Sequence, residues 1–248
     1  MKSRANTDVR WAKAVLLAAI TSWCGNASAT LLYDYSGSSV AIPDNNGSGV
    51  AFNFSLSDPA TSIASVTVTL DISGGYNGDV YAYLSHGSGF AVLLNRTGRG
   101  STTPGSSAAG YANSGFSLTF SSAASANVHF YQNNSPSYNG GGQLTGTWQP
   151  DGRGIDPELA ASSFDASGTA NFSTFAGLNP NGNWTLFLAD VSGGGISTLN
   201  DFTVSVSAVP EPANLALGIF GGILLSATLW RRVQRNRKVA KQSVTASA

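Results

Sequence analysis

Apolar and polar residues alternate with a period of two in short runs across residues 31–207, and this pattern constrains the fold most strongly. In one run Phe52, Phe54 and Leu56 are separated by single polar residues, and similar runs cover 66–72, 116–120, 184–188 and 202–206. Such a run forms a strand that buries one face. Gly, Asn, Asp or Pro bound each run, and no long period of 3.6 occurs in this region. The sequence therefore predicts an all-β fold, an antiparallel β-sandwich.

Composition supports an extracellular domain of this kind. Charged residues make up only 10% of the chain, so Ser, Thr, Asn and Gly must supply most of the solvated surface. Residues 97–115 and 132–143 are rich in Gly, Ser and Asn, which is typical of long surface loops. We expect them to connect the strands.

Charge is segregated along the chain although the net charge is zero. Residues 30–209 contain three basic residues (Arg96, Arg99 and Arg153) and eleven acidic ones, which gives 3 − 11 = −8. Nucleic-acid binding requires clustered Lys and Arg to neutralise phosphates. The acidic middle of the chain therefore argues against a nucleic-acid partner.

The N-terminal residues 1–29 are typical of a secretory signal peptide. A basic start leads into the apolar stretch AVLLAAITSW, and Ala27-Ser28-Ala29 forms a cleavage motif that makes Thr30 the first mature residue. We expect an N-terminal signal helix; an uncleaved N-terminal anchor is the alternative. The only cysteine, Cys24, precedes the cut, so the mature chain has no disulfide.

The C-terminus carries a second apolar stretch, residues 213–230, which is followed by Arg231 and Arg232. Its 18 residues reach about 27 Å as a helix, close to the roughly 30 Å of the hydrocarbon core. We therefore expect a single transmembrane helix over 213–230 and a basic cytoplasmic tail over 231–248. Pro210-Glu211-Pro212 directly precedes the helix, either as a stiff spacer or as a recognition element.

The combination of Val209-Pro210-Glu211-Pro212, one apolar helix and an arginine cluster resembles the PEP-CTERM sorting signal, over residues 209–233. The resemblance implies an exported protein that an exosortase processes in a bacterium producing exopolysaccharide. It also implies anchoring in the membrane through the helix, followed by transfer to the cell surface or extracellular matrix.

Residues 30–208 contain motifs of a known module. Ile42-Pro43-Asp44 and Gly78-Asp79-Val80 lie near the start, and residues 178–207 read LNPNGNWTLFLADVSGGGISTLNDFTVSVS. These motifs resemble the P domain (P/Homo B) found beside subtilisin-like proprotein convertases. Trp184, Asp190 and Leu199 match the ending, Phe202 replaces a common Trp, and LSHGSGFAVLL departs from the pattern. The resemblance implies a jelly-roll, galactose-binding-like sandwich.

Catalytic chemistry is not expected. The only histidines are His86 and His129, no G-x-S-x-G motif occurs, and a P domain does not itself cleave peptides. The residues left after removal of both terminal signals are all needed for the sandwich. We therefore predict that the chain is not an enzyme.

Calcium is the metal that the sequence best suits, because Asp71, Asp79, Asp190 and Asp201 flank two glycine-rich turns and supply oxygen ligands. They converge on a site if both turns lie at one end of the sandwich. The alternative is that each aspartate caps its own turn.

Tyr81 and Tyr83 share one face of the predicted strand VYAYL, opposite Val80, Ala82 and Leu84. Outward tyrosines suit a carbohydrate ligand; the alternative is that they pack beneath the loops.

Together these features predict a non-enzymatic exported surface or extracellular-matrix protein. The alternatives are a module that binds exopolysaccharide or a cell-surface protein, with or without a structural calcium ion, and a protease-associated accessory domain. An exosortase-like membrane enzyme and the membrane itself are the other expected partners.

Overall fold

The computed structural model describes residues 29–59, 62–209 and 212–245. The strands are β1 (Ala29–Tyr35), β2 (Val40–Ile42), β3 (Asn46–Leu56), β4 (Ser62–Gly74), β5 (Val80–His86), β6 (Gly89–Asn95), β7 (Phe116–Ser121), β8 (Leu144–Trp148), β9 (Gly182–Asp190) and β10 (Ser197–Val209). The 3-10 turns are η1 (Tyr131–Asn134), η2 (Ala161–Phe164) and η3 (Phe172–Phe175), and the C-terminal helix is α2 (Pro212–Thr245).

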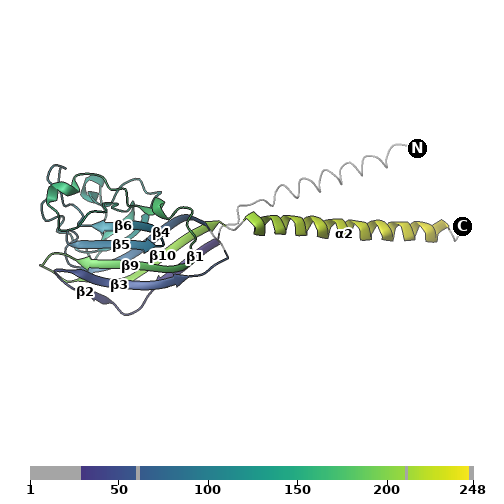
Figure 1. Ribbon diagram of the computed structural model, residues 1–248, viewed down its shortest axis with the longest axis horizontal. Coiled ribbons are helices and arrows are strands. Elements are labelled where there is room, and N and C mark those ends of the chain that lie inside the picture. Colours follow the sequence, from purple (N-terminus) through teal and green to yellow (C-terminus); the bar gives the residue numbers. More distant parts are fainter. Residues whose placement is uncertain (1–28, 60–61, 210–211, 246–248) are drawn as a thin grey trace.

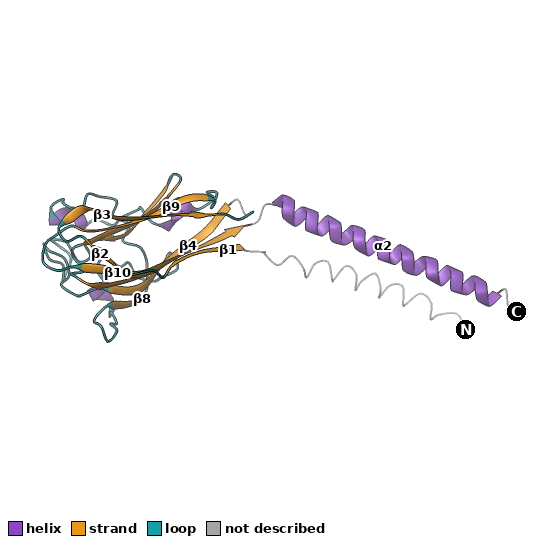
Figure 2. Cartoon of the chain, turned by 90° about the horizontal axis from the view of Figure 1, so that it is seen from below, coloured by secondary structure: helices purple, strands orange, loops and turns teal. Residues whose placement is uncertain are grey.

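The strands form two sheets, and the all-β prediction is confirmed (Figure 1). One sheet has six strands in the order β1-β10-β4-β7-β8, with β2 also paired to β10. The other has four strands in the order β3-β9-β5-β6. Figure 2 shows the two layers from the side.

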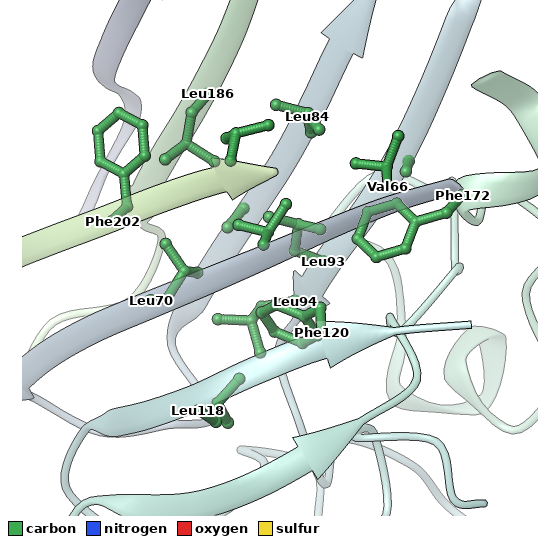
Figure 3. Packing of buried hydrophobic residues seen from close by; sticks show 14 of the residues in the cluster. Val66, Leu70, Leu84, Leu93, Leu94, Leu118, Phe120, Phe172, Leu186 and Phe202 are labelled. Carbon is green, nitrogen blue, oxygen red and sulfur yellow. The ribbon is translucent and has the colours of Figure 1, made fainter. Parts of the chain in front are cut away.

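The alternating side chains predicted to point inward meet between the sheets (Figure 3). Leu70 and Phe202 from the six-stranded sheet and Leu84 and Leu186 from the four-stranded sheet are all fully buried. Burying one such side chain contributes about 1.5–3 kcal/mol. The period-two pattern thus places the core between the layers.

Aromatic rings close the space between the two sheets where β1 and β10 face β3. The ring of Tyr33 stacks on Phe54 with centroids 4.0 Å apart, and Phe52 meets Phe202 edge-on at 5.3 Å. Each contact joins one sheet to the other, and such pairs contribute about 0.5–1.5 kcal/mol beyond burial.

One strand pair departs from the antiparallel prediction, because β8 runs parallel to β7. A parallel neighbour requires a crossover of a dozen or more residues. The connection over residues 122–143 supplies that length, and it contains the segment 132–143 predicted as a loop.

The helix α2 extends away from the sheets (Figure 1). Its side chains are described over residues 218–235, where the apolar stretch ends at Trp230 and Arg231 and Arg232 follow directly.

In the described part of the chain, no helix combines the length and apolarity that a bilayer crossing requires. The predicted transmembrane helix over 213–230 is therefore wrong, and so is the predicted localisation that anchored the chain in the membrane through it.

The predicted signal peptide lies almost entirely outside the described residues, which begin at Ala29. Ala29 pairs with Ala208, and Thr30 with Ser207, at the start of β1. The predicted cut after Ala29 therefore leaves all but the first residue of β1 in the mature chain.

Candidate binding face

Four aromatic side chains form a continuous cluster on the outer face of the four-stranded sheet: Tyr81, Tyr83, Phe90 and Phe187. We call this cluster the aromatic face. The ring of Tyr83 stacks on Phe187, its cross-strand neighbour, with centroids 4.9 Å apart. Phe90 lies 5.0 Å from Tyr83 on the other side, and Tyr81 lies 5.9 Å from Tyr83. All four side chains are half-buried.

The alternation of β5 produces this arrangement. Val80, Ala82 and Leu84 are buried in the core, so Tyr81 and Tyr83 must point to the outer face. The two tyrosines thus lie on the outer face of the sheet, which was one of the two alternatives that the sequence left open. They pack against neighbouring aromatic side chains as well as standing partly open to solvent.

The two tyrosine hydroxyls remain available for a ligand. Neither donates to nor accepts from another described residue, although burial and then the neighbouring Tyr83 raise the pKa of Tyr81 to about 12. The Tyr81 hydroxyl is thus a neutral donor and acceptor in the physiological range.

A row of polar side chains borders the aromatic face on β3 and β9. The hydroxyl of Thr185 donates to the amide oxygen of Asn53 at 2.7 Å, and Ser55 donates to Asn183 at 2.7 Å. Ala51 pairs with Phe187 in the register between β3 and β9 and is exposed. Because Ala51 is small, Phe187 has no bulky neighbour on the side opposite Tyr83.

A loop wall bounds the other side of the aromatic face. The amide of Val92 donates to Ala170, and Gly152 donates to Val92, so the outer edge of β6 is covered. A pocket of about 340 Å³ lies in this wall, with Phe90, Arg153 and Ile155 among its lining residues. The face therefore joins a concave region at Phe90.

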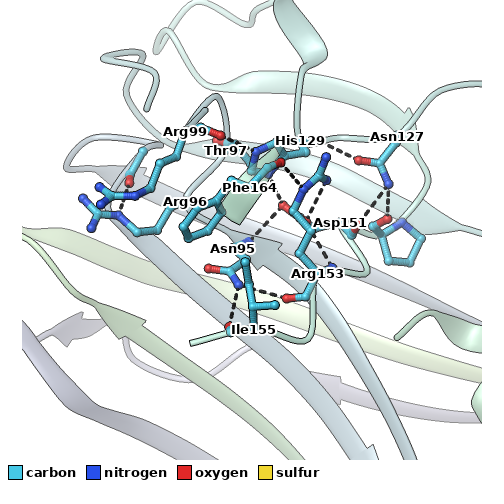
Figure 4. A network of polar contacts seen from close by, with 12 residues as sticks. Asn95, Arg96, Thr97, Arg99, Asn127, His129, Asp151, Arg153, Ile155 and Phe164 are labelled. Carbon is cyan, nitrogen blue, oxygen red and sulfur yellow. Dashed lines mark hydrogen bonds and ion pairs between the residues drawn. The ribbon is translucent and has the colours of Figure 1, made fainter. Parts of the chain in front are cut away.

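Beneath the loops lies a network of buried polar groups that sequence reasoning missed (Figure 4). We call it the buried network: Asn95, Arg99, His129, Asp151 and Arg153. His129 is fully buried, with Nδ1 2.6 Å from Asp151 Oδ2 and Nε2 2.8 Å from the Arg99 carbonyl oxygen. The other carboxylate oxygen of Asp151 accepts from Arg153 at 3.1 Å.

The buried network ties the long loops to β6. The backbone amide of Asn95 donates to Asp151 at 3.1 Å, and Arg153 Nε donates to the Phe164 carbonyl at 2.8 Å. The Arg153 guanidinium also lies 5.2 Å from the Phe130 ring centroid, a cation–π distance.

A signal for the buried network was present in the sequence. Arg96, Arg99 and Arg153 are the only basic residues of 30–209, and all three bond to loop or turn carbonyls in this region. Because residues 30–209 contain so few cations, each of these arginines marks a structural ion pair or carbonyl cluster.

The four predicted calcium ligands fall into two pairs. Asp71 and Asp201 are partners in the register of β4 and β10, and Asp71 accepts hydrogen bonds from Gln143 and Asn200. Asp79 and Asp190 lie together at the ends of β5 and β9.

Among the residues that the structure describes, no group of three or more His, Cys, Asp or Glu side chains is placed to hold a metal. The four aspartates therefore do not form one site.

The pair of Asp79 and Asp190 is buried and electrostatically unbalanced. Burial, followed by the charge of Asp190, raises the pKa of Asp79 to about 6, even though Arg96 lies 3.5 Å away. Burial also raises the pKa of Asp190. Ser197 donates to Oδ2 of Asp190 at 3.0 Å, whereas Oδ1 has no hydrogen-bond partner of normal geometry. Protonation relieves this excess of negative charge.

The sorting residues are only partly described. Val209 ends β10 and is half exposed, and Arg231 and Arg232 are exposed on α2. Pro210 and Glu211 lie outside the described residues, as does Ala27 of the predicted cleavage motif, and Pro212 is the first residue of α2.

Comparison with known proteins does not assign the chain to a family. No protein family matches it, and no curated protein is similar to it. The serine protease of Aeromonas sobria, solved with its chaperone, is 14% identical, with a TM-score of 0.40, over 80% of this chain and 30% of that one. The structure of the protease alone is also 14% identical, with a TM-score of 0.40, over 79% of this chain and 29% of the protease. This chain thus spans less than a third of their length, and likenesses this distant assign no function.

Proposed function

We propose that this chain is a non-enzymatic, exported β-sandwich protein that binds carbohydrate through the aromatic face. The observation that supports this most directly is the cluster of Tyr81, Tyr83, Phe90 and Phe187, half exposed beside a row of amide and hydroxyl side chains. Sugars present apolar C–H faces and hydroxyl rims, which suit rings and neutral polar groups respectively.

The chemistry of the region also suits a neutral ligand. Asn53, Ser55, Asn183 and Thr185 carry no charge and can both donate and accept. The free hydroxyls of the two tyrosines extend this set across β5. The described face thus offers hydrogen bonds to a polyol, and Arg153 in the adjoining pocket is already paired with Asp151.

The binding test compares soluble and insoluble polysaccharides by affinity electrophoresis and pull-down with residues 30–209. We expect Phe187→Ala and Tyr83→Ala to weaken binding at least about tenfold, or about 1.4 kcal/mol. The matched control is Tyr138→Ala, which removes an exposed tyrosine elsewhere. Binding that survives both face variants unchanged, or no binding to any glycan, contradicts the proposal.

Both histidines are engaged in ways that support a non-enzymatic role. His86 Nδ1 and Nε2 lie 2.8 and 2.6 Å from the carbonyl oxygens of Asn183 and Asn179. The ring nitrogens of His129 contact Asp151 and Arg99. A general base needs a ring nitrogen directed at the nucleophile, and these four nitrogens face acceptors instead.

Export and sorting rest on the sequence motifs. We propose that the signal peptide directs export and that Val209-Pro210-Glu211-Pro212, with Arg231 and Arg232, is read by an exosortase-type enzyme. Mass spectrometry of the protein from its native cells tests both cuts: a mature chain that starts before Thr30 contradicts the first, and an intact Ala248 contradicts the second.

The finer fold assignment, a jelly roll like the P domain, is part of the same proposal. Trp184, Leu199 and Phe202 of the motif are all fully buried between the sheets, which accounts for their presence in a sandwich ending. A crystal structure with a different strand connectivity would rule it out.

A further inference from the structure

A second concave site lies at the free edge of the six-stranded sheet, away from the aromatic face. Its floor is residues 145–148 of β8, and its walls are residues 125–126 and 134–137 of the crossover connection. We call this site the β8 groove, and its volume is about 600 Å³. It is large enough to hold one or two sugar units.

Backbone pairing leaves a short gap in the middle of this edge. At one end the amide of Thr145 donates to Ser137, and at the other the amide of Gln149 donates to Ala126. Alternate residues of a strand direct their backbone groups to opposite neighbours. Thr147, between those two, therefore directs its amide and carbonyl into the groove, and no described residue bonds to them.

The gap is too short to add a strand. Strand addition needs a run of free backbone groups along an edge, and here the segments at Ser137 and Ala126 already occupy both sides of Thr147. A compact ligand that bonds to one amide and one carbonyl fits instead.

Hydroxyl groups dominate the walls of the groove. Four side-chain hydroxyls, those of Ser125, Ser135, Ser137 and Thr147, make no hydrogen bond to any described residue, and all four residues are exposed. The Thr145 hydroxyl donates to the Ser137 carbonyl at 3.0 Å, which leaves its oxygen free to accept. These residues line the groove together with Thr147.

Charge decides the class of ligand. The described lining contains no Lys, Arg, Asp or Glu, and the surrounding residues 30–209 carry a net charge of −8. An anionic sugar finds no cation to pair with here and is repelled by the body as a whole.

We propose that the β8 groove binds a neutral, hydroxyl-rich ligand of one or two sugar units, with Thr147 at its centre. The ligand accepts from the Thr147 amide, donates to its carbonyl, and exchanges hydrogen bonds with the wall hydroxyls. The β8 groove is separate from the aromatic face, so this proposal does not depend on the function proposed above.

The test uses saturation-transfer NMR and calorimetry with methyl glucoside and methyl galactoside as neutral probes and glucuronate as the anionic probe. In a Tyr83→Ala background, which disables the aromatic face, we expect at least one neutral glycoside to bind and glucuronate to bind at least tenfold more weakly. Thr147→Trp fills the groove and should abolish this binding. Its matched control is Thr69→Trp, at an exposed strand position of the same sheet.

A milder variant guards against misfolding. Ser135 has a φ of 50°, a conformation that glycine adopts without strain. Ser135→Gly therefore removes a wall hydroxyl without destabilising the fold, and should weaken neutral-glycoside binding about threefold. The proposal is overturned if neither glycoside binds, if both groove variants bind like Thr69→Trp, or if glucuronate binds as tightly as the neutral probes.

Discussion

The buried network and the aromatic face both contain polar side-chain groups, but these groups differ in whether they have partners within the protein. In the buried network, Asp151 bonds with His129, Arg153 and the amide of Asn95, and both ring nitrogens of His129 are occupied. On the aromatic face, the hydroxyls of Tyr81 and Tyr83 have no partner among the described residues. The polar groups of the buried network stabilise the fold, whereas the hydroxyls of the aromatic face can bond to solvent or a ligand.

This difference shows why titratable residues are a poor guide to function in this chain. The two histidines and three body arginines hold loop backbone in place, because long loops without a core of their own need polar anchors. The groups that remain available are neutral: phenols, hydroxyls and amides. A search for binding partners should therefore begin with neutral glycans.

The largest expected effect is on the buried network. Asp151→Ala removes the carboxylate that neutralises Arg153, and breaking a buried ion pair on one side costs about 3–5 kcal/mol. Urea unfolding should show a loss of that size. Asp156→Ala, at an exposed position on the same loop, should change the free energy of unfolding by less than about 0.5 kcal/mol. A small effect of Asp151→Ala would show that the network does not anchor the loops.

The next effect concerns the buried pair of Asp79 and Asp190. The pKa of Asp79, about 6, lies above its usual 3.8, so the folded state holds the proton more tightly than the unfolded chain. This contribution to stability is full below about pH 4 and is lost as pH rises through about 6.

Asp79→Asn should therefore raise the free energy of unfolding at pH 7.5 by about 2 kcal/mol and flatten its pH dependence between 4 and 7. Denaturant unfolding across that range measures both. Asp165 provides the contrast, since hydrogen bonds from Ser101 lower its pKa to about 2. Its contribution to stability is present at neutral pH and disappears as pH falls through about 2, so Asp165→Asn should lower the free energy of unfolding at neutral pH and lose this effect in acid. A destabilised Asp79→Asn at pH 7.5 would instead indicate that its charge is needed.

A smaller effect on glycan affinity is expected when the hydroxyl of Tyr83 is removed and its ring is kept. Tyr83→Phe keeps the ring stacked on Phe187 and removes only the hydroxyl group. One neutral hydrogen bond contributes about 0.5–1.5 kcal/mol, so glycan affinity should fall about threefold while stability changes by less than about 0.5 kcal/mol. Titration calorimetry with the polysaccharide identified in the pull-down measures this. An unchanged affinity would assign binding to the rings alone.

The smallest effect is expected on the outer face of the six-stranded sheet. The hydroxyls of Thr69 and Thr119 lie 3.3 Å apart across β4 and β7 and are exposed. Thr69→Val should alter stability by less than about 0.5 kcal/mol and leave glycan binding unchanged in the same assays. A loss of binding there would remove the distinction between the two outer faces.

Much of the architecture could be predicted from local pattern. Strand positions and the outward direction of Tyr81 and Tyr83 follow from alternation alone, since a one-residue shift would bury the wrong face. The parallel pairing of β7 with β8 could not be predicted, because it depends on how the crossover over residues 122–143 returns. The C-terminal stretch was misjudged as membrane-spanning from its apolar composition.

The sequence by itself determined which residues lie inside and which outside, because alternation and turn residues act over a few neighbours. Only the tertiary structure decided which distant polar residues meet. It brought His129 to Asp151 and separated the four aspartates into two pairs. It also left the outward backbone groups of Thr147 without a described partner at a sheet edge. These outcomes depend on contacts between segments far apart in the chain, whose pairing no local pattern encodes.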